Sequence, residues 1–554
     1  VLGMLTKQIT LTLPLMVLLL EFGFFSRRTK TATVGLLLAA AVLAGVIPLL
    51  YHFNASGILS ITHENGNHPG EVVTSATYAM TQPRVVRTYL RLLAAPFGQT
   101  LLYDFPLAQG WTEPSTMASL LLLLIILGIA VAAWPRARLL AFGIGWFFIT
   151  LMVEASVIPI RHVIFEHRTY LPSVGFFIVA AWALQRVISY RRARIAVLVA
   201  VLAVLSVLTI QRNRVWQSGV AMWTDVAAKS PANARVFYNL GYEYLKAGDK
   251  DAALTNFSKA LLIDPDDELA LINRSQLLLD GGEGQRALHD INNALRLNPR
   301  RADSYLNRGA ILRGLGRFPE ALQDFEEAQT VDPEHRLAPV NRALTLGNLG
   351  RFTAGLKVIN DTITRHGESA KALAVRGALQ MGMRDAAGAV ESFSRGIALD
   401  PGDEELHRNR AQAWQVLGRF DRALEDLTVL IEKDPRQPDY YTQRAYVLTR
   451  LNRLNEALAD YALAGRRAPA LAEVYLERGK IYYKQGAYGQ AAAELDQYLN
   501  RSPGAADAFM LRGLTHYELR DFQQALADFQ RARDLGYSVD DAYFQQLKRV
   551  LGKI

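Results

Sequence analysis

Proline recurs at a fixed interval through the second half of this 554-residue chain. The series consists of Pro231, Pro265, Pro299, Pro333, Pro401, Pro435, Pro469 and Pro503, with Gly367 and Tyr537 at the two remaining positions. A repeat this short cannot bury a hydrophobic face alone, so neighbouring repeats must stack and share one continuous core. The period therefore predicts an all-α solenoid built from pairs of short helices.

The interval of about 34 residues is that of the tetratricopeptide repeat (TPR), a helix-turn-helix unit. With proline at position 32, the first repeat places Leu240, Gly241, Ala253 and Phe257 where two helices must approach closely. We predict nine repeats over residues 234–537 and a polar capping helix over 538–554. The fourth repeat carries Pro339, Gly355 and Gly367 at unusual positions, and we expect an irregular joint there.

Arginine occupies the seventh position of eight successive repeats, and in six of them an acidic residue follows at one constant spacing, within the second helix. The arginines are Arg274, Arg308, Arg342, Arg376, Arg410, Arg444, Arg478 and Arg512. This spacing predicts a ladder of Arg–carboxylate pairs along the stack, and the alternative is an anion-binding stripe. Arg342 and Arg376 face Val358 and Ser392 instead of an acid, so they are the better candidates for outside contacts.

The inner wall of such a solenoid is built mainly from the first helix of each repeat. Candidate exposed positions for binding a protein or peptide are Tyr238, Tyr242, Tyr446, Lys480, Tyr483 and Tyr517. Tyrosine rings stack on peptide or sugar, but the same residues are equally suited to packing between repeats. Both interpretations remain open from the sequence.

The first half of the chain is typical of a membrane protein. Six apolar segments of about 20 residues, the length that spans a bilayer, lie at 1–25, 31–51, 116–134, 139–157, 173–190 and 195–211. Residues 1–230 carry 18 Lys and Arg against 8 Asp and Glu, whereas residues 231–554 carry 43 against 44. We predict a transmembrane domain over 1–211 and a juxtamembrane linker helix over 212–233. The basic excess then reflects membrane topology, and no nucleic-acid partner is expected.

Basic residues cluster in alternate short loops, after the first, third and fifth apolar segments. The positive-inside rule places these loops in the cytoplasm. The loops over 52–115 and 158–172 then face outward, and so does the solenoid. We expect a multi-pass protein of the bacterial inner membrane with its repeats on the periplasmic side.

Both outer loops contain candidate lipid-binding residues. Arg84, Arg87 and Arg91 share one face of a predicted amphipathic helix, which suits either a simple interfacial anchor or a basic rim for an anionic lipid. In the second loop, Arg161, His162, Glu166, His167 and Arg168 cluster between two apolar segments. Arginine grips phosphate oxygens through its planar fork of donors. Alternatively, these charges pair with one another and merely end the helix.

The run from Phe165 to Ser173 resembles the Glu-Arg-x-x-Tyr-Leu-Pro-Ser stretch of the transmembrane-and-TPR O-mannosyltransferase family and its bacterial relatives, with His167 as an additional residue. Leu5-Thr6-Lys7-Gln8 and Arg212-Asn213-Arg214-Val215-Trp216 look like two further stretches of that family. The family is similar to GT-C glycosyltransferases, which take a sugar from a polyprenyl-phosphate donor at the outer face.

The resemblance implies that Arg161, His167, Arg168 and Tyr170 hold the lipid phosphate, with Glu166, Arg84 and Arg87 nearby, while the solenoid holds a protein acceptor. The acidic residue expected to activate the reaction in that family would precede Val1. We therefore expect this chain to lack an N-terminal region, and no catalytic residue is assigned. The alternative function is a non-catalytic membrane-anchored scaffold for envelope proteins.

The sequence lacks the motifs of several classes of enzyme and metal site. It contains no cysteine, which excludes disulfides and thiol catalysis. It has no glycine-rich phosphate loop, dinucleotide fingerprint or His-Glu-x-x-His motif. His63, Glu64 and His68 are too loosely spaced to predict a metal site. We expect neither a metal nor another cofactor.

Overall fold

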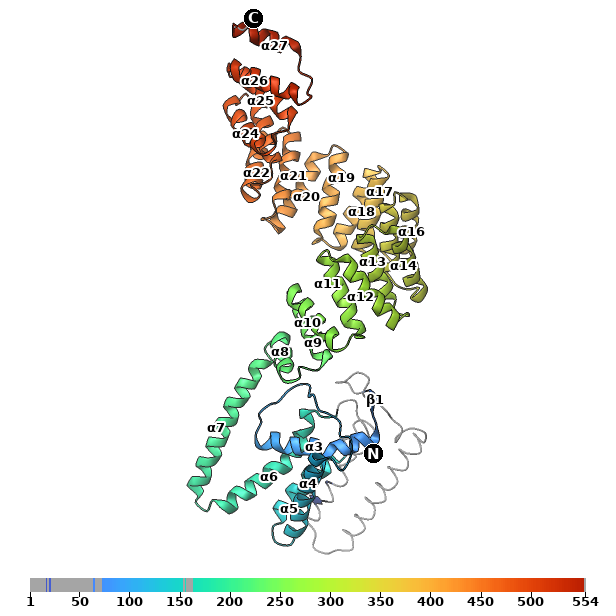
Figure 1. The fold of residues 1–554 in the computed structure, drawn as a ribbon, viewed down its shortest axis with the longest axis vertical. Helices are drawn as coiled ribbons and strands as arrows, with labels where there is room; N and C mark the ends of the chain where they lie inside the picture. The colour runs from blue at the N-terminus through green and yellow to red at the C-terminus, as the bar shows by residue number, and fades with distance from the viewer. Residues whose placement is uncertain are drawn as a thin grey trace. The chain divides into compact units, whose positions relative to one another are not determined.

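The computed structural model describes residues 16, 19–20, 63–64, 72–152, 155 and 163–552. The described part is almost entirely helical, and the predicted all-α class is confirmed (Figure 1). The chain divides into two compact units, Val1–Pro299 and Arg300–Ile554. The predicted apolar segments at 1–25 and 31–51 lie outside the described residues except for positions 16, 19 and 20.

In the described residues between 72 and 215, the first unit contains five α-helices. These are α3 (Ser75–Ala94), α4 (Pro114–Ala133), α5 (Arg138–Leu151), α6 (Tyr170–Val187) and α7 (Arg191–Val215), with a short 3₁₀ helix, η4 (Glu166–Thr169), before α6. Two short strands, β1 (His63–Glu64) and β2 (Val72–Val73), pair antiparallel. In the described residues, three helical stretches are long and apolar enough to cross a bilayer: Pro114–Ala133, Glu166–Val187 and Arg191–Val215.

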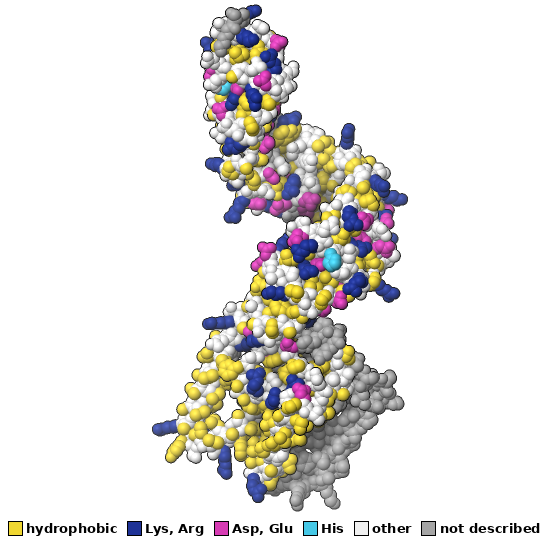
Figure 2. All heavy atoms as spheres, viewed as in Figure 1, with side chains coloured by type: hydrophobic (Ala, Val, Ile, Leu, Met, Phe, Trp, Pro, Cys, Tyr) yellow, Lys and Arg dark blue, Asp and Glu magenta, His cyan; other side chains and the backbone are white. Residues whose placement is uncertain are grey.

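Helices α5 and α6 approach each other through glycine. A side chain on Gly175 would overlap the carbonyl oxygen of Gly143, so only glycine permits this backbone contact. Helix α7 is different, because none of its residues is buried. Figure 2 shows hydrophobic side chains over its surface. An exposed apolar surface of this kind is unfavourable in water and favours contact with lipid.

The predicted amphipathic helix of the first outer loop forms α3, but its apolar face is covered by protein. Val85, Val86 and Tyr89 are buried in one cluster with Leu123 of α4 and Phe147 of α5. This packing leaves that face unavailable to the lipid headgroup region. Helix α3 is therefore a part of the folded core of the unit rather than a loose interfacial anchor.

Helix α8 (Gly219–Lys229) leads into the regular helix pairs. The first unit contains α9 (Ala234–Lys246), α10 (Lys250–Ile263), α11 (Glu268–Asp280) and α12 (Gly284–Leu297). The second unit contains α13 (Ala302–Gly314), α14 (Phe318–Val331), α15 (Leu337–Asn348), α16 (Phe352–His366), α17 (Ala370–Gly382), α18 (Ala386–Leu399), α19 (Glu404–Val416), α20 (Phe420–Lys433), α21 (Pro438–Arg450), α22 (Leu454–Arg467), α23 (Glu473–Lys484), α24 (Tyr488–Arg501), α25 (Ala506–Glu518), α26 (Phe522–Asp534) and α27 (Asp541–Val550).

In four repeats the two helices meet at a glycine that faces a phenylalanine ring, at Gly241, Gly309, Gly377 and Gly513. A Cβ on Gly309 would lie 2.6 Å from Cε1 of Phe325, too close for any side chain. Phe325 itself is fully buried. The repeat pattern therefore reflects packing, because the glycine makes room for the ring that fills the core.

The fourth repeat departs from this regularity at its end. In the repeats that end in proline, the residue before proline leaves the helix, since proline disfavours the helical conformation of its predecessor. Here Gly367 replaces the proline, and α16 continues to His366. Gly367 then ends the helix with φ of 81°, a conformation that favours glycine. Pro339 is tolerated because it lies in the first turn of α15, where backbone N–H groups have no helical partner.

Candidate functional site

Glu166 is the centre of the charged segment that precedes α6. Its Oε1 accepts hydrogen bonds from the backbone N–H of Thr100 and from the hydroxyl of Tyr103, both at 2.6 Å. Burial, and then the hydrogen bond and negative charge of Glu166, raise the pKa of Tyr103 far above its usual value. Tyr103 therefore stays protonated and remains a donor to Glu166. The two loops that were predicted to face outward are joined at this point.

The remaining predicted phosphate-binding residues of this segment point in different directions. The guanidinium of Arg168 is buried, donates to the carbonyl oxygen of Val163 at 3.3 Å and lies 5.4 Å from the centre of the Phe165 ring. His167 is exposed, with its ring 5.0 Å from that of Phe165. Tyr170 is 82% exposed. Arg161 lies outside the described residues.

The predicted basic rim on α3 is partly neutralised. Arg84 forms an ion pair with Glu113 at 3.1 Å and lies over the ring of Phe105. A hydrogen bond from Ser115, together with the charge of Arg84, lowers the pKa of Glu113. Arg87 is exposed. Of the two arginines, Arg87 is thus the one that faces the surroundings of the protein.

The segment that contains Thr100 and Tyr103 also holds the start of the helical repeats. The hydroxyl of Ser230 donates to the carbonyl oxygen of Leu102 at 2.9 Å, and Lys229 Nζ donates to that of Gln99 at 2.7 Å. Leu102 packs in one buried cluster with Val226 of α8 and Val236 of α9. The loop over 99–103 is therefore held by Glu166 and by the residues that open the solenoid. We call this arrangement the loop joint.

An ion-pair network stiffens the approach from α7 to the loop joint. Asp225 accepts from Arg212 Nη1 at 2.7 Å and from Lys229 Nζ at 2.6 Å. Burial alone would raise the pKa of Asp225, but the hydrogen bonds from Lys229 and Arg212 outweigh burial and lower it. Asp225 therefore remains charged at neutral pH and ties α7 to α8.

The candidate protein-binding residues fall into two groups. Tyr242 and Tyr446 are 43% and 42% exposed, and Lys480 pairs with Glu477 of its own helix at 2.7 Å. The other three are less exposed and pack against aromatic neighbours: Tyr238 against Phe257 and Tyr242, Tyr483 against Tyr488, and Tyr517 against Phe522 and Tyr543. Burial raises the pKa of Tyr483. Tyr242, Tyr446 and Lys480 are therefore better placed to contact a partner, which remains a prediction.

All six expected Arg–carboxylate pairs form. Five are bidentate, with both contacts between 2.6 and 2.9 Å, and they involve Asp290, Asp324, Asp426, Asp460 and Asp528. The pair of Arg478 with Glu494 has a single contact at 2.7 Å. The arginines without a ladder acid are also partnered, since Arg342 pairs with Glu326 and Arg376 donates to Ser392.

Sequence reasoning did not identify Thr100, Tyr103 or Glu113. They lie in an irregular segment between helices, where no periodicity indicates which side chains face inward. Their roles come from contacts with Glu166 and Arg84 that span 29 to 66 residues. Within the described residues, no group of three or more His, Asp or Glu side chains is arranged to hold a metal ion.

Comparison with known proteins agrees with the repeat architecture. The tetratricopeptide repeat family matches residues 234–267, and a second tetratricopeptide repeat family matches residues 272–336 and 476–537. A tetratricopeptide repeat protein from Parabacteroides merdae has 19% sequence identity and a TM-score of 0.36, with 45% of this chain and 98% of that protein covered.

Two curated relatives are protein O-mannosyl-transferases. Tmtc3 of Drosophila melanogaster is 28% identical over 180 residues, which is 30% of this chain and 19% of the relative. Human TMTC4 is 24% identical over 123 residues, which is 22% of this chain and 17% of the relative. The match thus spans less than a fifth of the length of these relatives. The chain thus contains tetratricopeptide repeats and, within its described residues, three candidate membrane-spanning helices, and it is similar to the TMTC protein O-mannosyl-transferases.

Proposed function

We propose that this chain is part of a membrane glycosyltransferase that transfers a sugar from a polyprenyl-phosphate donor to a protein acceptor outside the cytoplasm. The similarity to protein O-mannosyl-transferases supports the sugar-transfer class. The tetratricopeptide repeats support a protein acceptor or partner. The observation that carries the proposal is the loop joint, which holds the start of the repeats against the outer loop that also contacts Glu166.

The orientation that we propose in the membrane is inferred from the positions of basic residues between the apolar helices. Arg136 and Arg138 lie between α4 and α5, and Arg191, Arg192 and Arg194 open α7. By the positive-inside rule these turns lie on the cytoplasmic side. The loop joint and the solenoid then share the opposite side, which is the periplasm if the host is a bacterium with an inner membrane.

The exposed residues near the loop joint are the ones we propose for the donor phosphate. Arg87, His167 and Tyr170 face outward from α3, η4 and α6, and Arg161 is proposed with them. Arg168 and Glu166 hold backbone and tyrosine groups in place, which favours a positioning role for both. Arg84 acts through its pair with Glu113.

The test is sugar transfer in the native host. Cells lacking the gene are complemented with the complete protein, with an Arg87→Gln/Tyr170→Ala variant, or with Arg436→Gln as a control at an exposed solenoid turn. Hexose additions to envelope proteins are counted by mass spectrometry. We expect additions to depend on the gene, to fall at least about tenfold in the double variant, and to persist in the control. An unchanged glycoprotein profile after deletion of the gene would contradict the proposal.

A scaffold function is the second candidate, and one observation favours it. Glu166, Arg168 and Arg84 all satisfy internal partners, as structural charges do. A scaffold predicts that envelope proteins are lost from complexes when the gene is deleted, without any change in their sugars. Affinity purification alongside the glycoprotein profile therefore separates the two functions.

A further inference from the structure

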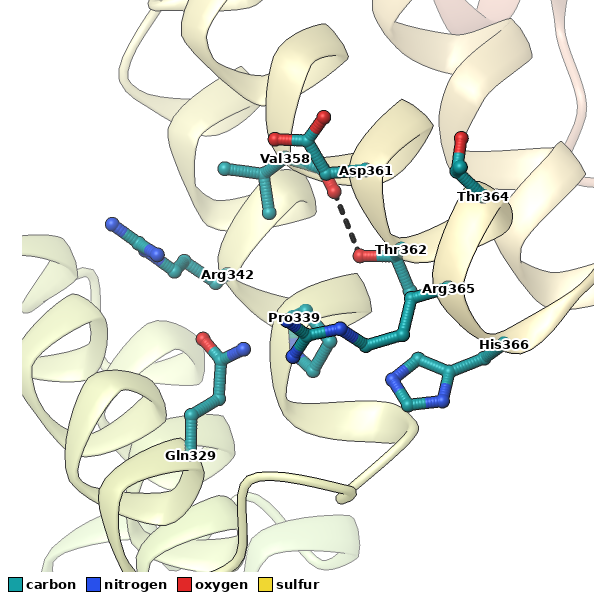
Figure 3. A pocket seen from close by; sticks show the side chains of 9 residues that line it. All are labelled: Gln329, Pro339, Arg342, Val358, Asp361, Thr362, Thr364, Arg365 and His366. Carbon is teal, nitrogen blue, oxygen red and sulfur yellow. Dashed lines mark hydrogen bonds between the residues drawn. The ribbon is translucent and has the colours of Figure 1, made fainter.

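The fourth repeat contains a cavity of about 450 Å³ in the second unit (Figure 3). It lies between α14, α15 and α16, and its polar lining includes Gln329, Arg342, Asp361, Thr362, Arg365 and His366. Unusual residues of the irregular repeat lie around it. Pro339 and Val358 line the cavity, and Gly367 allows α16 to continue to His366, which also lines it. The departures from the repeat pattern therefore meet at one place.

The replacement of the ladder acid by Val358 changes what Arg342 can bind. In the repeats whose Arg–Asp pair is bidentate, the arginine donates through Nε and Nη2 to the carboxylate of its own repeat. Several arginines also reach the preceding repeat, as Arg410 Nη1 does to Ser394 at 3.1 Å. Arg342 retains only this second kind of contact, with Glu326 at 2.7 Å. The carboxylate that would belong to its own repeat is missing.

Arg365 adds a second positive charge to the cavity. It is exposed, and within the described part of the chain no ion pair joins it to a carboxylate. Figure 3 shows its guanidinium reaching past Pro339 toward Gln329, whereas the carboxylate of Asp361 is turned away from it. Two guanidinium groups thus border the space beside Val358, whose position is an aspartate in the five repeats with bidentate pairs.

We propose that this cavity binds a glutamate or aspartate side chain of a protein partner. Arg342 and Arg365 would donate to the carboxylate, because a planar guanidinium fork matches carboxylate geometry. The Gln329 amide supplies a neutral donor at the same site. The volume suits one or two side chains rather than a folded domain. The inference builds on the proposed protein-binding role of the solenoid, but it is independent of sugar transfer.

The test uses the full chain in lipid nanodiscs and fluorescein-labelled peptides read by fluorescence anisotropy. One peptide contains alternating glutamate and serine, and its partner has glutamine at every glutamate. We expect the glutamate peptide to bind at least about tenfold more tightly than the glutamine peptide. Equal affinity for the two peptides would overturn the proposal, and so would binding of the glutamate peptide that excess inorganic phosphate abolishes at constant ionic strength.

Variants locate the binding to this cavity. Arg365→Gln removes a surface charge without touching the core and should weaken glutamate-peptide binding about tenfold. Val358→Asp restores the ladder acid, so it should occupy Arg342, weaken binding similarly and leave the thermal midpoint unchanged or higher. Arg376→Gln is the matched control, since Arg376 also lacks a ladder acid but does not line the cavity. Unchanged affinity in Arg365→Gln, or equal loss in Arg376→Gln, contradicts the proposal. Because the assay contains no sugar donor, its failure leaves the proposed transferase function standing.

Discussion

Arg410 and Asp426, 16 residues apart, meet in a bidentate ion pair, with Nε–Oδ2 at 2.9 Å and Nη2–Oδ1 at 2.6 Å. Asp426 is 2% exposed, and Arg410 also donates to Ser394 of the preceding repeat. One arginine therefore links both helices of its own repeat to the repeat before it. Because this arrangement recurs along the solenoid, the ladder of Arg–carboxylate pairs is part of the interface between stacked repeats.

Asp426→Asn should destabilise the solenoid, because it leaves Arg410 partly buried without its counter-charge. Breaking a buried pair costs about 3–5 kcal/mol, and the partial exposure of Arg410 places the expected loss near the lower end. Urea unfolding followed by circular dichroism measures it. The adjacent Glu425 is the matched control, since its pair with Arg422 is exposed and Glu425→Gln should change stability by less than about 1 kcal/mol. Equal effects of the two substitutions would contradict a structural role for the ladder.

Glu494→Asp should stabilise the C-terminal repeats. Arg478 Nε and Glu494 Oε2 are buried without hydrogen-bond partners in the described residues. The aspartates of five other repeats bond through both oxygens. Shortening the side chain allows the bidentate geometry, and one added buried hydrogen bond to a charged group is worth about 1.5–3 kcal/mol at most. A higher urea midpoint is expected, and a lower midpoint would show that the longer side chain is required.

The same site predicts a pH dependence. Burial outweighs the attraction of Arg478 and raises the pKa of Glu494. A raised pKa in the folded state means that the stability contribution is complete below the unfolded pKa, near 4.5, and is lost as pH rises through the folded pKa. The stabilising effect of Glu494→Asp should therefore grow with pH across this window. Urea midpoints of both proteins between pH 4 and pH 7 measure the difference, and a constant difference contradicts it.

Tyr103→Phe should loosen the loop joint. The substitution removes the 2.6 Å hydrogen bond to Glu166, and hydrogen bonds to charged groups contribute about 1.5–3 kcal/mol. Hydrogen exchange should become faster in residues 99–103 and in α8, which contacts the same loop. Tyr446→Phe is the control, because its exposed hydroxyl accepts only from Arg450 within its own helix among the described residues. Unchanged exchange in α8 would show that the loop and the solenoid start are independent.

Gly367→Ala should destabilise the fourth repeat by about 1 kcal/mol, because φ of 81° is unfavourable for a residue with a side chain. Gly489→Ala provides the contrast. Gly489 lies within α24, and an added Cβ would meet no atom within 4 Å. This second substitution should raise stability by up to about 1 kcal/mol through helix propensity. Thermal melts of both variants compare them directly, and a stabilising Gly367→Ala would contradict the proposed conformational requirement.

The features that could be predicted from the sequence are those that recur at the same position of each repeat. The proline period sets the positions equivalent to Arg410 and Asp426 in successive copies, so their constant offset was visible without coordinates. The contact between Tyr103 and Glu166 was not visible, because it spans 63 residues through irregular chain. The inward turn of Arg168 has the same origin, since the packing of Phe165 and Val163 decides it rather than local spacing. The cavity lies where Val358 replaces the ladder acid and where Gly367 replaces the repeat proline. Only the structure shows that these replacements leave an open space.

The most direct test of the account is the side of the membrane on which the solenoid lies. The sequence contains no cysteine, so single cysteines can be placed at Leu262 in α10 and at Tyr190 between α6 and α7, which are 83% and 81% exposed. We expect a membrane-impermeant maleimide to label Leu262→Cys in intact spheroplasts and Tyr190→Cys only after permeabilisation. Labelling of Tyr190→Cys but not Leu262→Cys in intact spheroplasts would place the solenoid in the cytosol and contradict the account.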